Sequence, residues 1–283
     1  MDGVRCPRCS AEMDIEADEI QCRGCGRPYP RLAGIPVLLR SPDAYLESCG
    51  RRLSLLVRQA AQTIDAIQEQ LNHGDLLSAT KDRCRATIQA VQAHADEIRS
   101  LLGSLLPTVE PVEQAANTPT PFQHIHYLYR DWGWPADPDG ENERALAAME
   151  SVIESKPLGR TLVIGAGACR LAYDLHRGGS ASDTIVVDID PLLFVAAQTV
   201  IRGDSLTLHE ANAEAPEIGE VSKAWRLKAP SGALDSREFH FMIADGREPP
   251  FGSVRSFRSS AARRWTASSV SSSRMRRLAA ESS

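Results

Sequence analysis

Apolar residues recur at intervals of three and four along two stretches of the chain, which is the spacing of a narrow apolar seam on an α-helix. The first seam consists of Leu53, Val57, Ala60, Ile64, Ile67 and Leu71, and the second of Cys84, Ile88, Val91, Ala95, Ile98, Leu102 and Leu105. The segment His73-Gly74-Asp75 interrupts the two helical runs. The pattern therefore predicts an antiparallel helical hairpin over residues 41–106, serving as a spacer or as an interaction element.

Three later stretches are short and apolar and have no polar face. They are Leu162–Ile164, Thr184–Val187 and Phe239–Ile243. Buried parallel strands have this composition, because both of their faces are covered. With the helical stretches between them they predict an α/β unit over residues 123–251.

The remaining segments differ in composition. Residues 1–40 are rich in Cys, Gly and Pro, and residues 107–122 form a Pro-rich linker. Residues 252–283 contain eleven Ser and seven Arg with Glu281 as their only acid, and they show neither strand alternation nor helical periodicity. We expect this last segment to be a disordered tail.

Bulk composition excludes some classes of protein. The net charge is −5, with 42% apolar and 24% charged residues, so nothing global favours binding to nucleic acid or to an anionic membrane. No stretch approaches the roughly 18 apolar residues of a spanning helix, and the N-terminus has no apolar signal core. Seven Cys in such a chain favour reduced thiols or metal ligands and a cytoplasmic location.

Four of these cysteines form two C-x-x-C pairs, Cys6 with Cys9 and Cys22 with Cys25. Two such knuckles supply the four thiolates of a closed tetrahedral zinc site, so the pattern predicts structural zinc in residues 1–40. The alternatives are two accidental pairs or a redox motif. A redox motif would need only one pair, beside a βαβ unit.

The segment from Tyr29-Pro30 through Gly34–Leu39 resembles the end of the zinc-ribbon activator subunits of tRNA, rRNA and protein methyltransferases. This resemblance implies a ribbon that braces a methyltransferase, here fused in the same chain. The alternative is a nucleic-acid-binding ribbon, but the acidic and basic residues of the segment are too balanced to favour it.

The strand at residues 162–164 runs into Gly165, Ala166 and Gly167, and a helix follows. These glycines allow the backbone to approach a ligand closely, and Asp188 follows Gly167 at the distance where an acidic side chain meets ribose hydroxyls. Asp190, before a proline, is expected to cap the next helix. Dinucleotides and S-adenosylmethionine share this geometry. Arg170 stands where a dinucleotide fingerprint has its third glycine, which argues against NAD.

Taken together, Gly165–Leu175, Val187–Pro191 and Ala244–Phe251 resemble class I S-adenosylmethionine-dependent methyltransferases. The resemblance implies a partial Rossmann-like sheet and S-adenosylmethionine as cofactor. It places the Gly165, Ala166, Gly167 loop beside the methionine portion, Asp188 on the ribose and Asp245 on the adenine, with Arg170 as a further cofactor-binding candidate. Val163 and Cys169 depart from the family, where an acid and a third glycine are usual.

The stretches Tyr129–Trp134 and Glu141–Arg144 look like the matching parts of carnosine N-methyltransferase-like proteins. This implies methyl transfer to nitrogen of a small molecule or peptide, with Arg130 holding a carboxylate and Trp132 and Trp134 lining a pocket. The alternative is that both tryptophans are core anchors. Methyl transfer needs little acid/base machinery, so no catalytic residue is assigned.

Related enzymes continue after Phe251 into a fourth, central strand, whereas this chain continues into the Ser/Arg-rich segment Gly252–Ser283. We therefore expect a C-terminally truncated or frameshifted methyltransferase of impaired activity, whose first strand has an exposed apolar edge. The alternative is a non-catalytic protein whose ribbon and hairpin bind a protein partner. A third hypothesis for the function is an NAD-binding oxidoreductase.

Overall fold

The structure is a computed structural model that describes residues 3–15, 19–73, 75–106, 124–133, 140–153, 158–212, 214–235 and 237–252. Three parts of the sequence-based interpretation lie outside the described residues. They are the linker at 107–122, the side chain of Trp134 and the tail beyond residue 252.

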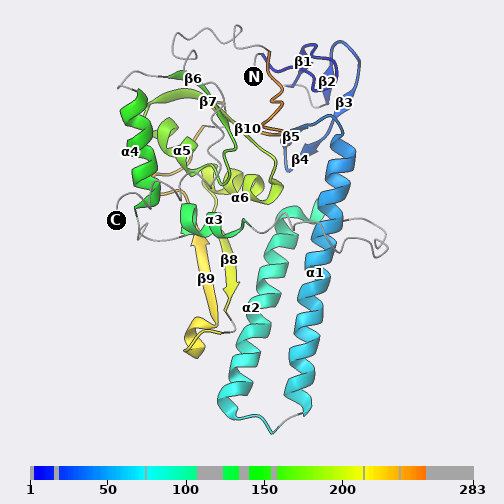
Figure 1. Ribbon diagram of the computed structural model, residues 1–283, viewed down its shortest axis with the longest axis vertical. Helices are drawn as coiled ribbons and strands as arrows, with labels where there is room; N and C mark the ends of the chain where they lie inside the picture. The colour runs from blue at the N-terminus through cyan, green and yellow to red at the C-terminus, as the bar shows by residue number, and fades with distance from the viewer. Residues whose placement is uncertain are drawn as a thin grey trace, which may run out of the picture.

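A five-stranded sheet forms the centre of the molecule, in the order β4-β5-β10-β7-β6 (Figure 1). Its strands are β4 (Arg31–Leu32), β5 (Ile35–Leu38), β6 (Gly159–Ile164), β7 (Ala181–Asp188) and β10 (Phe239–Ala244). The three predicted strands are β6, β7 and β10, and they lie side by side and parallel. The predicted α/β class is confirmed.

The fourth parallel strand comes from the N-terminal segment. β5 pairs with β10 through Val37 with Ile243 and Leu38 with Ala244, and β4 pairs antiparallel on its outer side. All four residues of β5 are buried, because an apolar strand in a parallel sheet is covered on both faces. The segment that resembles the end of an activator ribbon is thus also a strand of the main sheet.

The two faces of the sheet are covered by different modules. Along β7, Val186 packs into the cluster that contains α5 (Arg170–Arg177) and α6 (Pro191–Ile201). Its neighbours Ile185 and Val187 pack into the cluster that contains the cysteine-rich ribbon. Because successive side chains of a strand point to opposite faces, helices cover one face and the ribbon covers the other.

The ribbon is a small antiparallel sheet of β1 (Met13–Asp14), β2 (Ile20–Cys22) and β3 (Pro28–Tyr29). It also meets the far end of the described chain. Val4 forms an antiparallel bridge with Phe251, and the Arg5 amide donates to the Pro250 carbonyl at 2.8 Å. The ribbon is therefore joined to the rest of the chain by backbone hydrogen bonds as well as by apolar packing.

The predicted helical hairpin consists of α1 (Pro42–His73) and α2 (Ser78–Leu102), followed by the 3-10 turn η1 (Gly103–Leu105). Figure 1 shows the two helices running side by side away from the sheet. At the base of the hairpin Leu53, Ile98 and Leu102 are fully buried in the main core. The far half of α1 is mostly exposed. The base of the hairpin thus belongs to the core, and its tip projects.

The long segment before β10 forms a second hairpin, β8 (Leu206–Ala211) with β9 (Ser222–Leu227), and the 3-10 turn η3 (Ile218–Glu220) lies between them. It packs on α2, where Glu97 accepts from the His209 amide at 3.1 Å and Arg83 donates to the Pro216 carbonyl. The other elements are α3 (His126–Leu128), the π-helical turn η2 (Tyr129–Gly133) and α4 (Glu141–Ile153).

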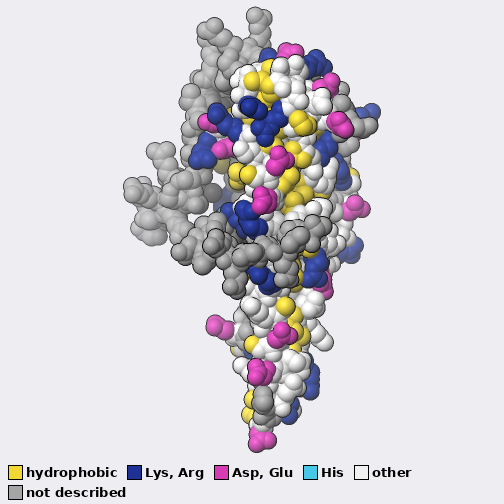
Figure 2. Space-filling model, turned by 90° about the vertical axis from the view of Figure 1, so that its right-hand side faces the viewer, with side chains coloured by type: hydrophobic (Ala, Val, Ile, Leu, Met, Phe, Trp, Pro, Cys, Tyr) yellow, Lys and Arg dark blue, Asp and Glu magenta, His cyan; other side chains and the backbone are white. Residues whose placement is uncertain are grey.

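β6 is an edge strand within the described part of the chain. No described strand pairs with its outer side, and Ile164 is 48% exposed. No helix among the residues that the structure covers is long and apolar enough to cross a membrane. On the face shown in Figure 2, basic and acidic side chains are interspersed along the molecule, which is unlike the single-sign patch of a nucleic-acid interface.

A shared core predicts that a cavity at the base of the hairpin destabilises the sheet as well. Ile98→Ala should lower the free energy of unfolding by about 2–4 kcal/mol. All four tryptophans lie beyond residue 130, outside the hairpin, so their fluorescence reports mainly on the sheet and the elements packed on it, whereas helical circular dichroism reports mainly on the hairpin. In urea the unfolding transitions seen by both signals should shift together.

The control Leu77→Ala, at a side chain 77% exposed, should change the free energy of unfolding by less than about 0.5 kcal/mol. A shift in the circular dichroism transition alone would show that the hairpin unfolds independently.

Candidate functional site

The four predicted zinc ligands lie together. The sulfurs of Cys6, Cys9, Cys22 and Cys25 all lie within 4.8 Å of one another. Cys6 Sγ is 3.9 Å from Cys25 Sγ, and Cys9 Sγ is 3.4 Å from Cys22 Sγ. A tetrahedral site with zinc–sulfur bonds of about 2.3 Å separates its sulfurs by about 3.8 Å. The cluster is therefore consistent with structural zinc, and its donor set leaves no open position for a substrate.

Backbone amides support this cluster. The amides of Arg8, Gly24 and Cys25 point at cluster sulfurs at 3.4 Å. The knuckle is tight, because a Cβ on Gly24 would lie 2.5 Å from the side chain of Ala11. This is why a glycine stands inside the second C-x-x-C pair.

The structure adds to the cysteine cluster one residue that the sequence analysis did not assign to it. The hydroxyl of Tyr29 lies 3.2 Å from Cys6 Sγ. Burial raises the pKa of Cys6, but the hydrogen bonds from Tyr29 and from the Arg8 amide outweigh it and lower that pKa to about 6. Tyr29 therefore favours the thiolate, the form that binds a metal. The sequence singled out Tyr29 only through the resemblance to an activator ribbon, and no spacing rule predicts its contact with Cys6.

The glycine loop and Asp188 lie at the carboxyl end of the parallel strands. Gly165 and Gly167 have positive φ angles of 69° and 55°, a conformation that favours glycine. Asp188 Oδ2 accepts from the Gly167 amide at 2.8 Å, and Oδ1 accepts from the amides of Ile189 and Asp190. Asp188, the residue predicted to contact a ribose, thus lies beside the glycine loop, and its contact with a ribose stays a prediction. Its carboxylate also organises the loop.

Asp190 caps α6, as its position before Pro191 predicts. Its Oδ1 accepts from the amides of Leu192 and Leu193 at 3.0 and 3.2 Å. Burial raises the pKa of Asp190 to about 6; the two amides act against this shift, and the charge of Asp188 adds to it. The two neighbouring carboxylates therefore have separate structural duties.

Asp245 follows β10 and lies at the same edge of the sheet. Its carboxylate binds the amide and the guanidinium of Arg247, and these contacts lower its pKa. The Asp245 side chain is 30% exposed. A ligand at this position would compete with Arg247 for the same carboxylate.

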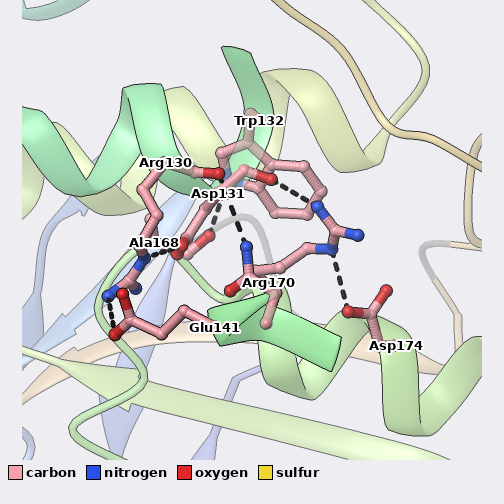
Figure 3. A network of polar contacts seen from close by, with 8 residues as sticks. Arg130, Asp131, Trp132, Glu141, Ala168, Arg170 and Asp174 are labelled. Carbon is pink, nitrogen blue, oxygen red and sulfur yellow. Dashed lines mark hydrogen bonds and ion pairs between the residues drawn. The ribbon is translucent and has the colours of Figure 1, made fainter. Parts of the chain in front are cut away.

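The segment of η2 forms a network with the glycine loop, drawn in Figure 3. The indole nitrogen of Trp132 donates to the Ala168 carbonyl at 2.8 Å, and Trp132 is 4% exposed. Arg170 donates to the Asp131 carbonyl and pairs with Asp174. In this structure Trp132 is a core residue that supports the loop, which is the alternative that the sequence left open.

Arg130, the predicted carboxylate-binding residue, is paired with carboxylates of the chain itself. It binds Asp131 at 2.6 Å and Glu141 at 3.0 Å, and its guanidinium lies over the ring of Tyr127. Asp131 is buried, which raises its pKa, while Arg130 opposes that shift. The Arg130 side chain is 23% exposed, so a substrate carboxylate would have to displace or join these partners.

Two exposed apolar side chains flank the loop. Ile164 ends β6 and Ile189 follows Asp188, and they are 48% and 49% exposed. A Cβ on Gly246 would lie 2.7 Å from Ile164, so the turn after β10 approaches the end of β6. Glycine loop, carboxylates and apolar side chains thus meet at one edge of the sheet.

Comparison with known proteins identifies no family for this chain. No protein-family model matches the chain, and no curated protein matches it either.

A bound zinc ion gives the first test of the site. The purified chain should contain about one zinc, Cys22→Ser should lose it, and Cys84→Ser, outside the cluster, should keep it. Tyr29→Phe should weaken zinc affinity about tenfold, because the thiolate loses its hydroxyl donor. Elemental analysis and competition with a chelating dye measure these effects. A native chain without zinc after chelator-free purification would contradict the prediction, as would equal zinc content in the two cysteine variants.

Proposed function

We propose that this chain belongs to an S-adenosylmethionine-dependent methyltransferase that transfers a methyl group to nitrogen of a small molecule or peptide. One observation carries the proposal. A carboxylate after the second parallel strand, Asp188, lies 2.8 Å from the amide of Gly167 in a glycine loop after the first. In open α/β sheets ligands bind outside the carboxyl ends of the strands, with an acid on the ribose hydroxyls.

The proposal assigns separate tasks to the residues at this edge. The positive-φ glycines Gly165 and Gly167 leave two positions of the loop without a side chain, so that a ligand can approach the backbone there. Asp188 has two carboxylate oxygens with about four acceptor positions, and three amides use them. One acceptor position stays available for a ribose hydroxyl.

Ile164 and Ile189 offer apolar surface on either side of Asp188. An adenine ring would cover such surface, and covering apolar surface is favourable at about 25 cal/mol per Å². Asp245, at the end of the next strand, would accept from the adenine amino group after giving up part of its contact with Arg247.

S-adenosylmethionine supplies an activated methyl group on a sulfonium. In the transfer the bond from that methyl to sulfur breaks, the bond to the acceptor nitrogen forms, and the nitrogen loses a proton to solvent. The chain would contribute placement in line and at short range, which needs no catalytic triad. Trp132 and Arg170 would act by holding the loop at Ala168 and by fixing the η2 segment against it.

Structural zinc is the second part of the proposal. The Cys6, Cys9, Cys22, Cys25 cluster would hold the ion and make the ribbon a rigid cover for one face of the sheet. Zinc in such a site contributes folding free energy and takes no part in chemistry.

A second candidate function is non-catalytic binding of a protein partner by the ribbon and hairpin. The observation that favours it is that Arg130, Asp188 and Asp245 are already paired within the chain. On the hairpin, a hollow of about 600 Å³ is lined, among the residues that the structure describes, by Gln59, Gln62, Thr63, Ala66 and Ile67 of α1. None of these described side chains is titratable, so the hollow suits contact better than chemistry.

Titration calorimetry with S-adenosylhomocysteine separates these functions. The proposal expects saturable binding to the intact, zinc-containing chain and none with NADH as the comparison ligand. Absence of heat for S-adenosylhomocysteine, with normal zinc content and circular dichroism, would reject the methyltransferase and favour the partner-binding function. Binding of NADH alone would indicate an oxidoreductase.

Neighbouring carboxylates give a matched pair of variants. Asp188→Ala should weaken S-adenosylhomocysteine binding about tenfold or more, because a charged partner of the ribose is lost at roughly 1.5–3 kcal/mol. Asp190→Ala should instead lower the free energy of unfolding by about 1 kcal/mol through loss of a helix cap, with a smaller effect on affinity. Asp188→Asn keeps an acceptor oxygen beside Gly167, so its affinity for S-adenosylhomocysteine should lie between those of the native chain and Asp188→Ala. Equal affinity losses in the Asp188→Ala and Asp190→Ala variants would show that the ligand contact is assigned to the wrong residue.

A further inference from the structure

A short segment of chain leads from the zinc ribbon to the candidate cofactor loop. β5 ends at Leu38, beside Ala244 of β10. α1 begins at the buried Pro42, and Tyr45 lies within its first turn. The Tyr45 amide donates to the Ser41 carbonyl at 3.1 Å, so its backbone is fixed at the helix start. Tyr45 is thus joined to the end of β5 by only six residues of chain, and it also packs against the main core.

The hydroxyl of Tyr45 reaches the loop itself. It donates to the Ile189 carbonyl at 2.6 Å, across 144 positions of sequence. Burial raises the pKa of Tyr45 far above its ordinary range, and Cys49 and the charges of Asp190 and Asp188 raise it further. The phenol keeps its proton at neutral pH and acts as a donor.

Ile189 is the one residue between the two carboxylates, and polar contacts hold both ends of it. Its amide donates to Asp188 at 2.6 Å, and its carbonyl accepts from Tyr45. Ile189 is 49% exposed, so apolar packing covers only part of it. Asp188 before it pairs with Ile243 of β10, and Asp190 after it caps α6. The Tyr45 hydroxyl adds a restraint on the one residue between these two fixed points.

We propose that Tyr45 is a positioning residue of the candidate cofactor site, and that the cysteine-rich ribbon helps to fix the position of Tyr45 through β5. Loss of the metal should then loosen the Asp188–Asp190 loop. The link between ribbon and loop is independent of the ligand. The consequence for ligand affinity rests on the proposed methyltransferase function.

Side-chain packing explains how a change in the ribbon would alter the end of β5, and through it the position of Tyr45. Cys6 and Cys22 are each 2% exposed, and they pack in one cluster with Leu38, Met242 and Ala244. Leu38 is the last residue of β5, and Ala244 is its partner on β10. Without the metal these cysteines lose their common centre, and the end of β5 loses the surface that holds it.

Tyr45→Phe tests the link, because it removes the hydroxyl and keeps the ring. The matched control is Thr63→Val, since Thr63 also directs its hydroxyl at a backbone carbonyl, that of Gln59, in the exposed far half of α1. The first readout is hydrogen exchange of the ligand-free chain at the amides of Ile189 and Asp190. Loss of one hydrogen bond should speed exchange there about fivefold in Tyr45→Phe and leave it unchanged in Thr63→Val. Equal exchange in native chain and Tyr45→Phe would overturn the proposal.

Zinc removal by a chelator tests the role of the ribbon. Exchange at Ile189 and Asp190 should rise by at least as much as in Tyr45→Phe, and by more than at Val195–Val200 in the middle of α6. A uniform rise along the chain would show that zinc supports the fold generally, and no rise at the loop would exclude any link. Either result overturns the ribbon part of the proposal.

Calorimetry with S-adenosylhomocysteine then tests the consequence for the site. Tyr45→Phe should bind about fivefold more weakly than the native chain, and Thr63→Val should bind as tightly. Faster loop exchange with unchanged affinity would overturn Tyr45 as a positioning residue for this ligand. If the native chain binds no S-adenosylhomocysteine, the proposed function fails, whereas the exchange results still decide the link between ribbon and loop.

Discussion

The architecture depends on the need of a parallel sheet to be covered on both faces. β7 and β10 carry apolar side chains toward both sides, and a strand of this kind is stable only between two layers. Helices α5 and α6 supply one layer. The other layer is the cysteine-rich ribbon, which packs Ile20, Cys22 and Tyr29 against Val187 and Met242. A unit of about forty residues is too small to build much core of its own, so ribbon and sheet each supply what the other lacks.

Local signals in the sequence were sufficient for local structure. The two helices of the hairpin, the three apolar strands, the Asp190 cap and the cysteine knuckles each depend mainly on residues close to one another along the chain, and all of them are present. Contacts between segments that are distant along the chain give no such local signal in the sequence. β5 has the same apolar composition whether it ends a ribbon or joins a sheet, and only its pairing with β10 decides between them.

The candidate site shows the same division. The spacing from Gly167 to Asp188 along the chain singled out Asp188 as a candidate ligand contact, and in the structure Asp188 lies beside the loop. Trp132 could not be assigned, because a tryptophan in a pocket and one in a core follow the same local pattern, and its burial results from Ala168 and Tyr173. Tyr29 and Tyr45 were missed because a single hydroxyl gives no periodicity, and its partner is known only when the chain is folded.

The pairing of β5 with β10 also affects how the chain is made. Val37 leaves the ribosome about 200 residues before its partner Ile243, which corresponds to roughly 10–40 s of synthesis. During that time an apolar strand has no neighbour on its sheet side and is open to wrong partners. The four cysteines all precede β5 along the chain and need no later segment to bind a metal. A metal bound early would fold the ribbon against its own short strands and shelter β5 until β10 has been synthesised.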